Sequence, residues 1–403
     1  MEMKYDDLAW ERSDNLFEGF KKKAASSDVL RGVTKFMAVQ RPSAQPLDRA
    51  YIVGLGAFNI CYRMQFDDGF ASLLRFASSA VIFPEEKIEA EVAVMKFIKE
   101  NTKIPVPKVL SYGMHGPCDL GPYILMEYVH HTSNLTSQLR APGYKRGDRP
   151  FLDPNIAEEK LELLYGKVSN ILLELSKHSF DKIGCLSNGP YELSVKRRPL
   201  TMNMNELVQL GNFPRSQLPL SPFTSASAYL ESLAATSFKH LSTQRNDAVE
   251  SPEDCRRKYI ARKILLKLNS GLSDRDMSNS GQSKLYCDDL RPTNILIDKN
   301  MDIVAVIDWE FTYAAPAEFI YSPPWWLLLE APEDWRWEDI AIREGSLLEA
   351  QRLSMRMRES WDSGAFWINY GLRKSWAFDI VWPFIDRRIF GGNKSLEGSS
   401  HSS

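Results

Sequence analysis

A short polar segment, Asp289-Leu-Arg-Pro-Thr-Asn294, carries three side chains that suit phosphoryl transfer. Asp289 offers a carboxylate that can accept a hydroxyl proton late in such a reaction. Asn294 offers a neutral oxygen for Mg²⁺, and Asp308 offers the anionic oxygens that this hard cation prefers. Arg291 keeps its charge and could meet the γ-phosphate. Phosphoryl transfer needs mainly orientation and charge compensation, and this set could supply both.

Two strand-like runs, residues 294–297 and 303–307, flank a polar turn and predict a hairpin. The hairpin would bring its two open ends together, so that Asn294 and Asp308 would lie close to each other. The turn itself contains Asp298, Asn300 and Asp302. We interpret these three as turn formers, because isolated Asp and Asn residues at turns usually bond their own backbone.

The elements around this hairpin change in type along the chain. Short strands are predicted at residues 50–53, 60–66 and 70–76, and extended segments at 106–111 and 123–128. A helix is predicted over residues 84–101, because Pro84 suits the first turn of a helix and the acidic residues after it suit the N-terminal end. The remainder of the chain is mostly helical in pattern, so the sequence predicts an α+β fold.

We predict four regions from these patterns. They are a helical extension over residues 1–44, a β-rich lobe over 45–129, a larger helical lobe over 130–392, and a disordered Ser/Gly-rich tail over 393–403. The helical lobe should contain a core helix over 158–176, weaker helices over 225–241 and 255–268, and loop-rich stretches over 188–222 and 270–283. Nine of the ten tryptophans stand at Trp309 or later, where we expect most of them in a helical core.

These segments resemble the aminoglycoside phosphotransferase family, relatives of the protein kinases, and especially its fungal branch. The resemblance extends over most of the chain and includes Ile104-Pro-Val-Pro-Lys108, Leu125-Met-Glu-Tyr128, Asp308-Trp-Glu-Phe-Thr-Tyr-Ala-Ala-Pro316 and Ser322-Pro-Pro-Trp-Trp326. It implies a protein-kinase-like two-lobed fold, with a small β-rich N-lobe and a larger helical C-lobe. It also implies a cleft for ATP and Mg²⁺, and transfer to a hydroxyl of a small molecule.

The resemblance carries over three roles, with Asp289 as the catalytic aspartate and Asn294 and Asp308 as metal ligands. The sequence departs from the family just before them. Cys287 stands where the family usually has histidine, and Asp288 stands where it usually has glycine. The histidine mainly braces the loop, and a second carboxylate beside Asp289 could disturb the local charge.

The segment Gly54-Leu-Gly-Ala-Phe-Asn59 resembles a loop that covers nucleotide phosphates. It provides Gly54, Gly56 and Asn59 as candidates for nucleotide binding, although the protein-kinase form of the loop has a third glycine where Asn59 stands. An ordinary hairpin turn is the alternative interpretation. The position between two strands, upstream of a catalytic segment, favours the phosphate loop.

Arg75 occupies the place in the third strand where protein kinases keep a phosphate-binding lysine. An arginine can pair with phosphate, and a solvated strand arginine is the alternative. We predict Glu91 as its partner, because Glu91 lies three residues after Ile88 and four before Met95 on the apolar face of the helix. A charge on a buried face needs a partner. Glu89 would point elsewhere.

The segment Leu125-Met-Glu-Tyr-Val129 resembles the hinge whose backbone groups meet adenine, with Glu127 and Tyr128 as candidate residues, and a plain buried strand would have the same pattern. The acidic run over residues 330–339 could attract a cationic amine, but we interpret it as a solvated surface.

Parts of the sequence pattern bear on two other functions. A pseudokinase that binds a nucleotide or a partner without turnover is favoured by Cys287, Asp288, Arg75 and Asn59, and disfavoured by the retained Asp289, Asn294 and Asp308. A kinase acting on protein Ser or Thr is excluded, because the segment between Asp308 and residues 315–318 is too short for an activation loop.

The composition limits partners and location. The 403 residues are 44% hydrophobic and 25% charged, with a formal net charge of -2, so we expect a soluble protein with no nucleic-acid or membrane partner. Five scattered cysteines without a CxxC pair argue against a disulfide framework or a zinc site. The charged N-terminus lacks the apolar stretch of a secretory signal, so we expect a cytoplasmic location. The sequence leaves the oligomeric state and the substrate open.

Overall fold

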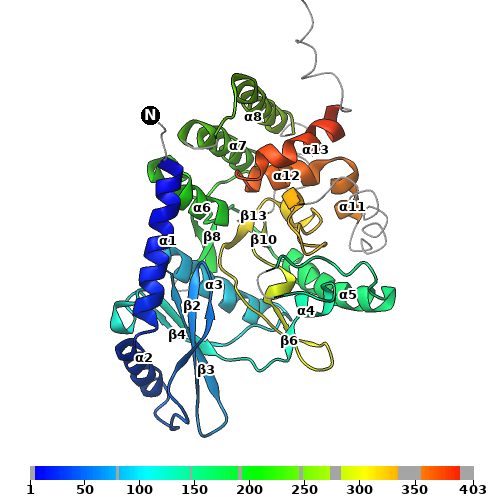
Figure 1. Cartoon of the computed structure of the whole chain (residues 1–403). Coiled ribbons are helices and arrows are strands. Elements are labelled where there is room, and N and C mark those ends of the chain that lie inside the picture. Colours follow the sequence, from blue (N-terminus) through cyan, green and yellow to red (C-terminus); the bar gives the residue numbers. More distant parts are fainter. Residues whose placement is uncertain are drawn as a thin grey trace, which may run out of the picture.

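The computed structural model describes residues 5–78, 81–145, 148–188, 193–244, 248–272, 283–334 and 355–390. Its N-terminal part is one five-stranded antiparallel sheet in the order β1-β2-β3-β5-β4, with helices around it (Figure 1). The elements of this part are α1 (Tyr5–Ala24), α2 (Ser27–Val39), β1 (Tyr51–Leu55), β2 (Asn59–Gln65), β3 (Ala71–Ala77), α3 (Pro84–Asn101), β4 (Val109–Gly113), the 3-10 turn η1 (Pro117–Asp119) and β5 (Tyr123–Glu127).

Helices cover both faces of this sheet. Helix α2 packs Val29, Val33 and Met37 into a cluster with the inward side chains of β2 and β3. Helix α3 packs on the other face and joins a larger apolar cluster that continues into the C-terminal part. The predicted bounds of α3 are those observed, with Pro84 in its first turn. The N-terminal residues therefore build the core of the sheet, because their apolar stripe covers a face that water would otherwise reach.

The C-terminal part is largely helical and also carries three small sheets. Its elements are β6 (Ser133–Asn134), α4 (Thr136–Leu139), α5 (Glu158–Ser176), β7 (Ser179–Phe180), β8 (Cys185–Asn188), β9 (Leu193–Arg197), α6 (Met202–Leu210), η2 (Arg215–Gln217), α7 (Ala226–Thr243), α8 (Pro252–Leu272), β10 (Ser283–Cys287), η3 (Pro292–Asn294), β11 (Ile295–Ile297), β12 (Ile303–Val306), β13 (Thr312–Ala315), α9 (Ala317–Ile320), η4 (Pro332–Asp334), α11 (Met355–Asp362), α12 (Ala365–Arg373) and α13 (Phe378–Phe390). The strand orders are β13-β10-β7, β12-β11-β6 and β8-β9.

The predicted hairpin is present as β11 and β12, which pair antiparallel with Ile295 opposite Val306. The segment that carries Asp289 lies between β10 and this hairpin, and β10 pairs with β13, which follows Asp308. Two strand pairings therefore fix both ends of the segment. This is the framework that holds the candidate site.

The prediction of a loop-rich stretch over 188–222 is wrong in part, because β9 and α6 lie there. Helix α6 has an ordinary N-cap, since the Thr201 side chain accepts a hydrogen bond from the Met204 N–H, and Gly211 ends it. Strands β10 and β13 were also not predicted. The tail over 393–403 and most of the loop over 270–283 lie outside the described residues.

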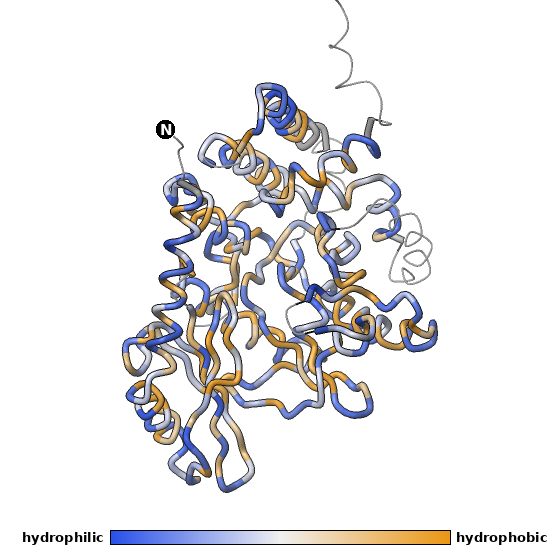
Figure 2. Tube along the Cα trace, viewed as in Figure 1, coloured by the Kyte–Doolittle hydropathy of each residue, from blue (hydrophilic) through white to orange (hydrophobic). Residues whose placement is uncertain are grey.

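Hydropathy follows this architecture. Helix α1 is largely hydrophilic along its length, whereas hydrophobic stretches gather in the strands of the N-terminal sheet (Figure 2). The described tryptophans from Trp309 onward are mostly buried, as predicted, and five of them belong to the larger core cluster: Trp309, Trp326, Trp361, Trp367 and Trp382. Within the described ranges, no helix is both long and apolar enough to cross a membrane.

Candidate functional site

Asp289 is held by two neighbours in its own segment. The Asn294 side-chain amide donates to the Asp289 carbonyl oxygen at 2.9 Å and to Oδ2 at 3.2 Å. Arg291 Nε lies 3.0 Å from Oδ1, and the Arg291 side chain remains 45% exposed. Burial raises the pKa of the Asp289 carboxyl, and Arg291 opposes that rise. A fixed carboxylate with a raised proton affinity suits a group that accepts a hydroxyl proton.

Asn294 and Asp308 are brought together, as the hairpin predicts. The Ile307 N–H donates to the Asn294 carbonyl oxygen at 2.9 Å, so Asp308 follows directly after this contact. Asp308 adopts a φ of 63°, a left-handed conformation that costs a non-glycine residue free energy. Because Asn294 uses its amide nitrogen to hold Asp289, its Oδ1 is the atom left for a cation.

Arg75 on β3 forms an ion pair with Glu91 on α3, as predicted, and Glu89 pairs elsewhere, with Arg197. Arg75 also reaches Asp308, with Nη1 2.7 Å from Oδ1. The alternative of a solvated strand arginine is wrong, since the Arg75 side chain is only 6% exposed. Arg75 therefore connects the sheet and α3 to the predicted metal ligand.

A second buried group stands beside Arg75 and was not predicted. Lys87 on α3 forms an ion pair with Glu310, and both side chains are almost fully buried. Asn59 joins them, because its Oδ1 accepts from Lys87 Nζ at 2.7 Å and its Nδ2 donates to Glu310 Oε2 at 2.8 Å. The side chain of Asn59 is therefore engaged inside the protein.

The sequence contains a signal for Lys87 but none for its pairing with Glu310. Lys87 lies one helical turn before Glu91, on the same buried face, so the argument that selected Glu91 also selects Lys87. Glu310 stands two residues after Asp308. Nothing in the spacing alone shows that it pairs with Lys87.

The charges around Asp308 do not balance. Glu91, Asp308 and Glu310 supply three carboxylates, whereas Arg75 and Lys87 supply two cations. Burial and the Glu310 carboxylate raise the pKa of Asp308 to about 7, despite Arg75. Burial also opposes ionisation of Glu310, but Lys87 and Arg75 outweigh it and hold the pKa of Glu310 below its usual value. The excess negative charge falls on Asp308, whose side chain is 29% exposed.

This charge pattern fits Mg²⁺. Within the described ranges, no group of three or more His, Cys, Asp and Glu side chains is arranged to hold a metal ion. Mg²⁺ does not require such a cage, because it keeps several waters and takes one or two protein oxygens together with phosphate oxygens. The partly exposed Asp308 carboxylate and the Asn294 Oδ1 would supply those protein oxygens.

Cys287 and Asp288, the two departures from the family pattern, both have partners. Cys287 Sγ lies 3.9 Å from the carbonyl oxygens of Asp308 and Glu310, close enough for the thiol to brace that turn. Burial raises the pKa of Cys287, which keeps it a thiol. Asp288 Oδ2 accepts from the Met202 N–H at 3.2 Å. Burial raises the pKa of Asp288, and the nearby Arg373 offsets part of that rise.

The Gly54–Asn59 turn joins β1 and β2, although Gly54 and Leu55 still belong to β1 and Asn59 begins β2, and the Gly56 N–H donates to the Asn59 carbonyl oxygen at 2.9 Å. A Cβ atom on Gly54 or Gly56 would meet nothing closer than 3.7 Å. Packing within the described chain therefore does not demand either glycine. Close approach of a ligand to this turn is one reason for glycine that remains.

The hinge segment uses some of its groups inside the protein. The Tyr128 N–H donates to the Ala71 carbonyl oxygen at 2.9 Å, and Glu127 Oε1 accepts from the Lys108 N–H at 2.7 Å. Tyr128 also packs its ring under the Arg63 guanidinium. Within the described chain, the Val129 N–H makes no hydrogen bond, so it is the hinge donor left for a ligand. Val129 belongs to the predicted hinge segment, although the residues predicted to bind the nucleotide there are Glu127 and Tyr128.

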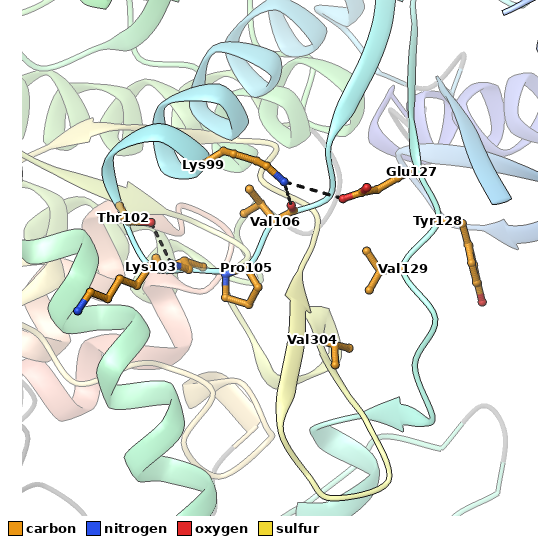
Figure 3. A pocket seen from close by; sticks show the side chains of 10 residues that line it. Lys99, Thr102, Lys103, Pro105, Val106, Glu127, Tyr128, Val129 and Val304 are labelled. Atoms are coloured by element: carbon orange, nitrogen blue, oxygen red, sulfur yellow. Dashed lines mark hydrogen bonds and ion pairs between the residues drawn. The ribbon is translucent and has the colours of Figure 1, made fainter. Parts of the chain in front are cut away.

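A cavity of about 460 Å³ lies beside the hinge (Figure 3). Its lining comes from the end of α3, residues 102–106, the hinge and the β11–β12 hairpin, and includes Lys99, Lys103, Glu127, Tyr128 and Val304. None of the groups around Asp289 or Asp308 lines it. The cavity is therefore separate from the candidate catalytic groups.

Comparisons with known proteins agree with this architecture. No protein-family model matches the chain. The chain is 25% identical over 296 residues to "Altered inheritance of mitochondria protein 9, mitochondrial" of Yarrowia lipolytica, a match that covers 66% of this chain and 50% of that protein. It is also 25% identical over 297 residues to "Clavilactone A biosynthesis cluster protein Y" of Ampulloclitocybe clavipes, covering 70% of this chain and 65% of that protein. The chain thus spans about half to two thirds of the length of these curated relatives.

Among solved structures, the chain resembles a thermostable mutant of aminoglycoside phosphotransferase APH(4)-Ia in a ternary complex with ADP and hygromycin B. The TM-score is 0.50 at 15% sequence identity, and the match covers 90% of this chain and 100% of that chain. This similarity concerns the fold.

Proposed function

We propose that this chain, which has the fold shared by aminoglycoside phosphotransferases and protein kinases, transfers the γ-phosphoryl group of ATP to a hydroxyl of a small molecule. The observation that carries the proposal is the way Asn294 joins the two chemical groups. Its amide holds the Asp289 carboxylate, and its carbonyl oxygen accepts the N–H of the residue before Asp308. A proton acceptor and a cation ligand are thereby fixed relative to each other.

In the proposed reaction, the substrate oxygen forms a bond to the γ-phosphorus as the bond to the β,γ-bridging oxygen breaks, and ADP leaves. Asp289 orients the substrate hydroxyl and takes its proton. Mg²⁺, held by Asn294 and Asp308, would supply charge compensation for the phosphate oxygens when bound. Arg291 is exposed enough to meet the transferred group and return to Asp289.

Acidic side chains lie near Asp289. Asp288, Glu333 and Asp289 interact electrostatically with Glu206 on α6, and Lys374 opposes their effect on the pKa of Glu206. Burial raises the pKa of Glu206, and the neighbouring carboxylates add to the rise. We therefore expect an acceptor that carries positive charge to be favoured, and a substrate screen should include amino alcohols and aminated sugars beside neutral ones.

Purified protein should bind ADP more tightly with Mg²⁺ than with EDTA, and should release ADP from ATP in the presence of an acceptor from that screen. Asp289→Asn should retain Mg²⁺-dependent ADP binding and lose at least 100-fold in transfer rate, because general-base groups typically contribute 10²–10⁴-fold. Asp302→Asn is the matched control, since Asp302 is 66% exposed and pairs with Lys167 on the far end of the hairpin.

The alternative proposal is a nucleotide- or partner-binding pseudokinase. It would be favoured if Mg²⁺-dependent ADP binding were present but no acceptor supported turnover. The absence of any Mg²⁺-dependent nucleotide binding in the wild type would instead contradict the enzyme proposal. The cytoplasmic location stays a prediction, and fractionation of cells that express the tagged full chain would test it.

A further inference from the structure

Lys87 is buried in a place where a lysine is costly. Its side chain is 0% exposed, and its Nζ is satisfied by the Glu310 carboxylate and by the Asn59 amide oxygen. Moving an ammonium and a carboxylate out of water costs several kcal/mol each, and their attraction often does no more than offset that cost. An apolar pair of similar volume would serve stability equally well. The retention of charge at this position therefore calls for another explanation.

The Lys87 group joins three segments that lie far apart in the sequence. Asn59 ends the Gly54–Asn59 turn, Lys87 belongs to α3, and Glu310 follows Asp308 in the turn after β12. Each of the three side chains contacts the other two. A shift of any one segment must therefore break two polar contacts or carry the others with it.

The turn that carries Asp308 needs such support. Asp308 and Phe311 both adopt left-handed backbone conformations, with φ values of 63° and 56°. Such conformations persist only where the surroundings fix them. Arg75 holds the Asp308 side chain, and Lys87 holds Glu310 two residues further on, so the turn is anchored at both positions from the N-terminal part.

We infer that Lys87 and Glu310 are positioning residues, which couple the Gly54–Asn59 turn and α3 to the orientation of the metal ligand Asp308. This inference rests on the proposed function. Neither side chain touches the reacting atoms, because both are buried. Their effect on Mg²⁺-dependent binding is exerted through Asn59 and Asp308.

Stability and coupling can be separated with a double substitution. Lys87→Met with Glu310→Leu removes both charges at once, so no unpaired buried charge remains, and the expected loss of stability is that of an Asn59 amide left without partners, about 1–3 kcal/mol. The same double substitution removes both partners of the Asn59 side chain and the anchor of the Asp308 turn. We expect the gain in ADP affinity on adding Mg²⁺ to fall at least tenfold, with ADP binding in EDTA unchanged.

The matched control is another ion pair, formed in the helical part by Arg262 on α8 and Asp379 on α13. Arg262→Met with Asp379→Leu makes the same kind of change and should leave the Mg²⁺-dependent gain as it is in the wild type. If the Lys87–Glu310 double variant is stable and shows the full Mg²⁺-dependent gain, the pair is structural only and the inference is overturned.

Hydrogen exchange of the ligand-free protein provides a readout that does not need the proposed function. In the Lys87–Glu310 double variant, amides of residues 54–59 and 308–311 should exchange faster together, whereas the Arg262–Asp379 control should leave both segments unchanged. A wild type without Mg²⁺-dependent binding would contradict the proposed function alone. Unchanged exchange in both segments would contradict the coupling alone.

Discussion

Two groups of ion-paired side chains in the described residues differ in whether their cations and anions are equal in number. Arg262 and Asp379 in the helical part form a bidentate pair, with N–O distances of 2.6 and 3.1 Å, and Arg262 Nε also donates to the Ser237 carbonyl oxygen. One cation meets one anion, and the guanidinium is satisfied by its neighbours. In the other group, called the Asp308 group, Arg75 and Lys87 face three carboxylates: Glu91, Asp308 and Glu310.

This difference in charge balance indicates a different role for each group. A balanced pair fixes two helices and has no remaining affinity for another charge. An unbalanced group has one more carboxylate than it has cations, and here the partly exposed Asp308 must share Arg75 with Glu91. Buried like charges that lack a counter-ion are typical of sites that bind one.

The largest expected effect comes from removing a single charge from the Asp308 group. Lys87→Met alone leaves Glu310 buried without its cation, which should lower the free energy of unfolding by about 3–5 kcal/mol. Urea denaturation followed by circular dichroism would measure it. Comparable losses in Lys87→Met and in the double variant Lys87→Met/Glu310→Leu would show that the charge left on Glu310 is not the cause.

Breaking the balanced Arg262–Asp379 pair should lower the free energy of unfolding by less and leave the Asp308 group unchanged. Arg262→Met leaves Asp379 unpaired, but 30% of the Asp379 side chain is exposed and water can solvate it. We expect a loss of about 2–3 kcal/mol, below the 3–5 kcal/mol of a fully buried pair, with no change in Mg²⁺-dependent ADP binding. A change in that binding would show that the two regions are coupled.

The balanced region also contains a buried titrating group, His240. Burial and the nearby Arg262 lower the pKa of His240 to about 4, and its ring packs edge-on against Trp376. The folded state thus binds the proton more weakly than the unfolded state, so stability is lost as the pH falls below about 6.5. Relative to His240→Phe, the wild type should lose about 2 kcal/mol between pH 7 and pH 5.

Thermal unfolding of both proteins across that pH range would test this prediction. Parallel curves for the wild type and His240→Phe would show that His240 titrates normally. Mg²⁺-dependent ADP binding at pH 7 should be the same in both, because His240 belongs to the helical part.

Removing the unbalanced charge itself should affect binding more than folding. Asp308→Asn leaves two cations and two anions in the Asp308 group, as the pairs Arg75–Glu91 and Lys87–Glu310. The free energy of unfolding should therefore change little. The Mg²⁺-dependent gain in ADP affinity should fall at least tenfold, about 1.4 kcal/mol. Isothermal titration with and without Mg²⁺ would measure it, and an undiminished gain would remove Asp308 from the metal site.

Much of the fold follows from local patterns in the sequence. Turn residues and alternating strands predicted the N-terminal sheet, Pro84 predicted the start of α3, and the apolar face of α3 predicted the Arg75–Glu91 pair. These features depend on residues near each other in the chain or on one helix face. Similarity to solved structures confirms the two-lobed kinase-like fold.

The rest depends on contacts that no local pattern encodes. Lys87 pairs with Glu310 only because the folded chain brings distant segments together. For the same reason Asp288 lies near Arg373 and accepts a hydrogen bond from the Met202 N–H. Helix α6 was missed for another reason, because a capping threonine and a terminal glycine were present but outweighed by the prolines and asparagines nearby. The chemical roles of Asp289, Arg291, Asn294 and Asp308 stay predictions.

Helix α1 gives the two parts of the molecule a further connection, besides the hinge and the contacts of Arg75 and Lys87. Its C-terminal end is tied to the sheet region, where Tyr62 donates to the Ala24 carbonyl oxygen at 2.9 Å. Its middle is tied to α6, where Gln209 donates to Ser13 Oγ at 2.7 Å. A rotation of one part against the other about the hinge must therefore slide or detach a 20-residue helix. If the proposed transfer takes place, α1 would resist any such rotation that product release requires.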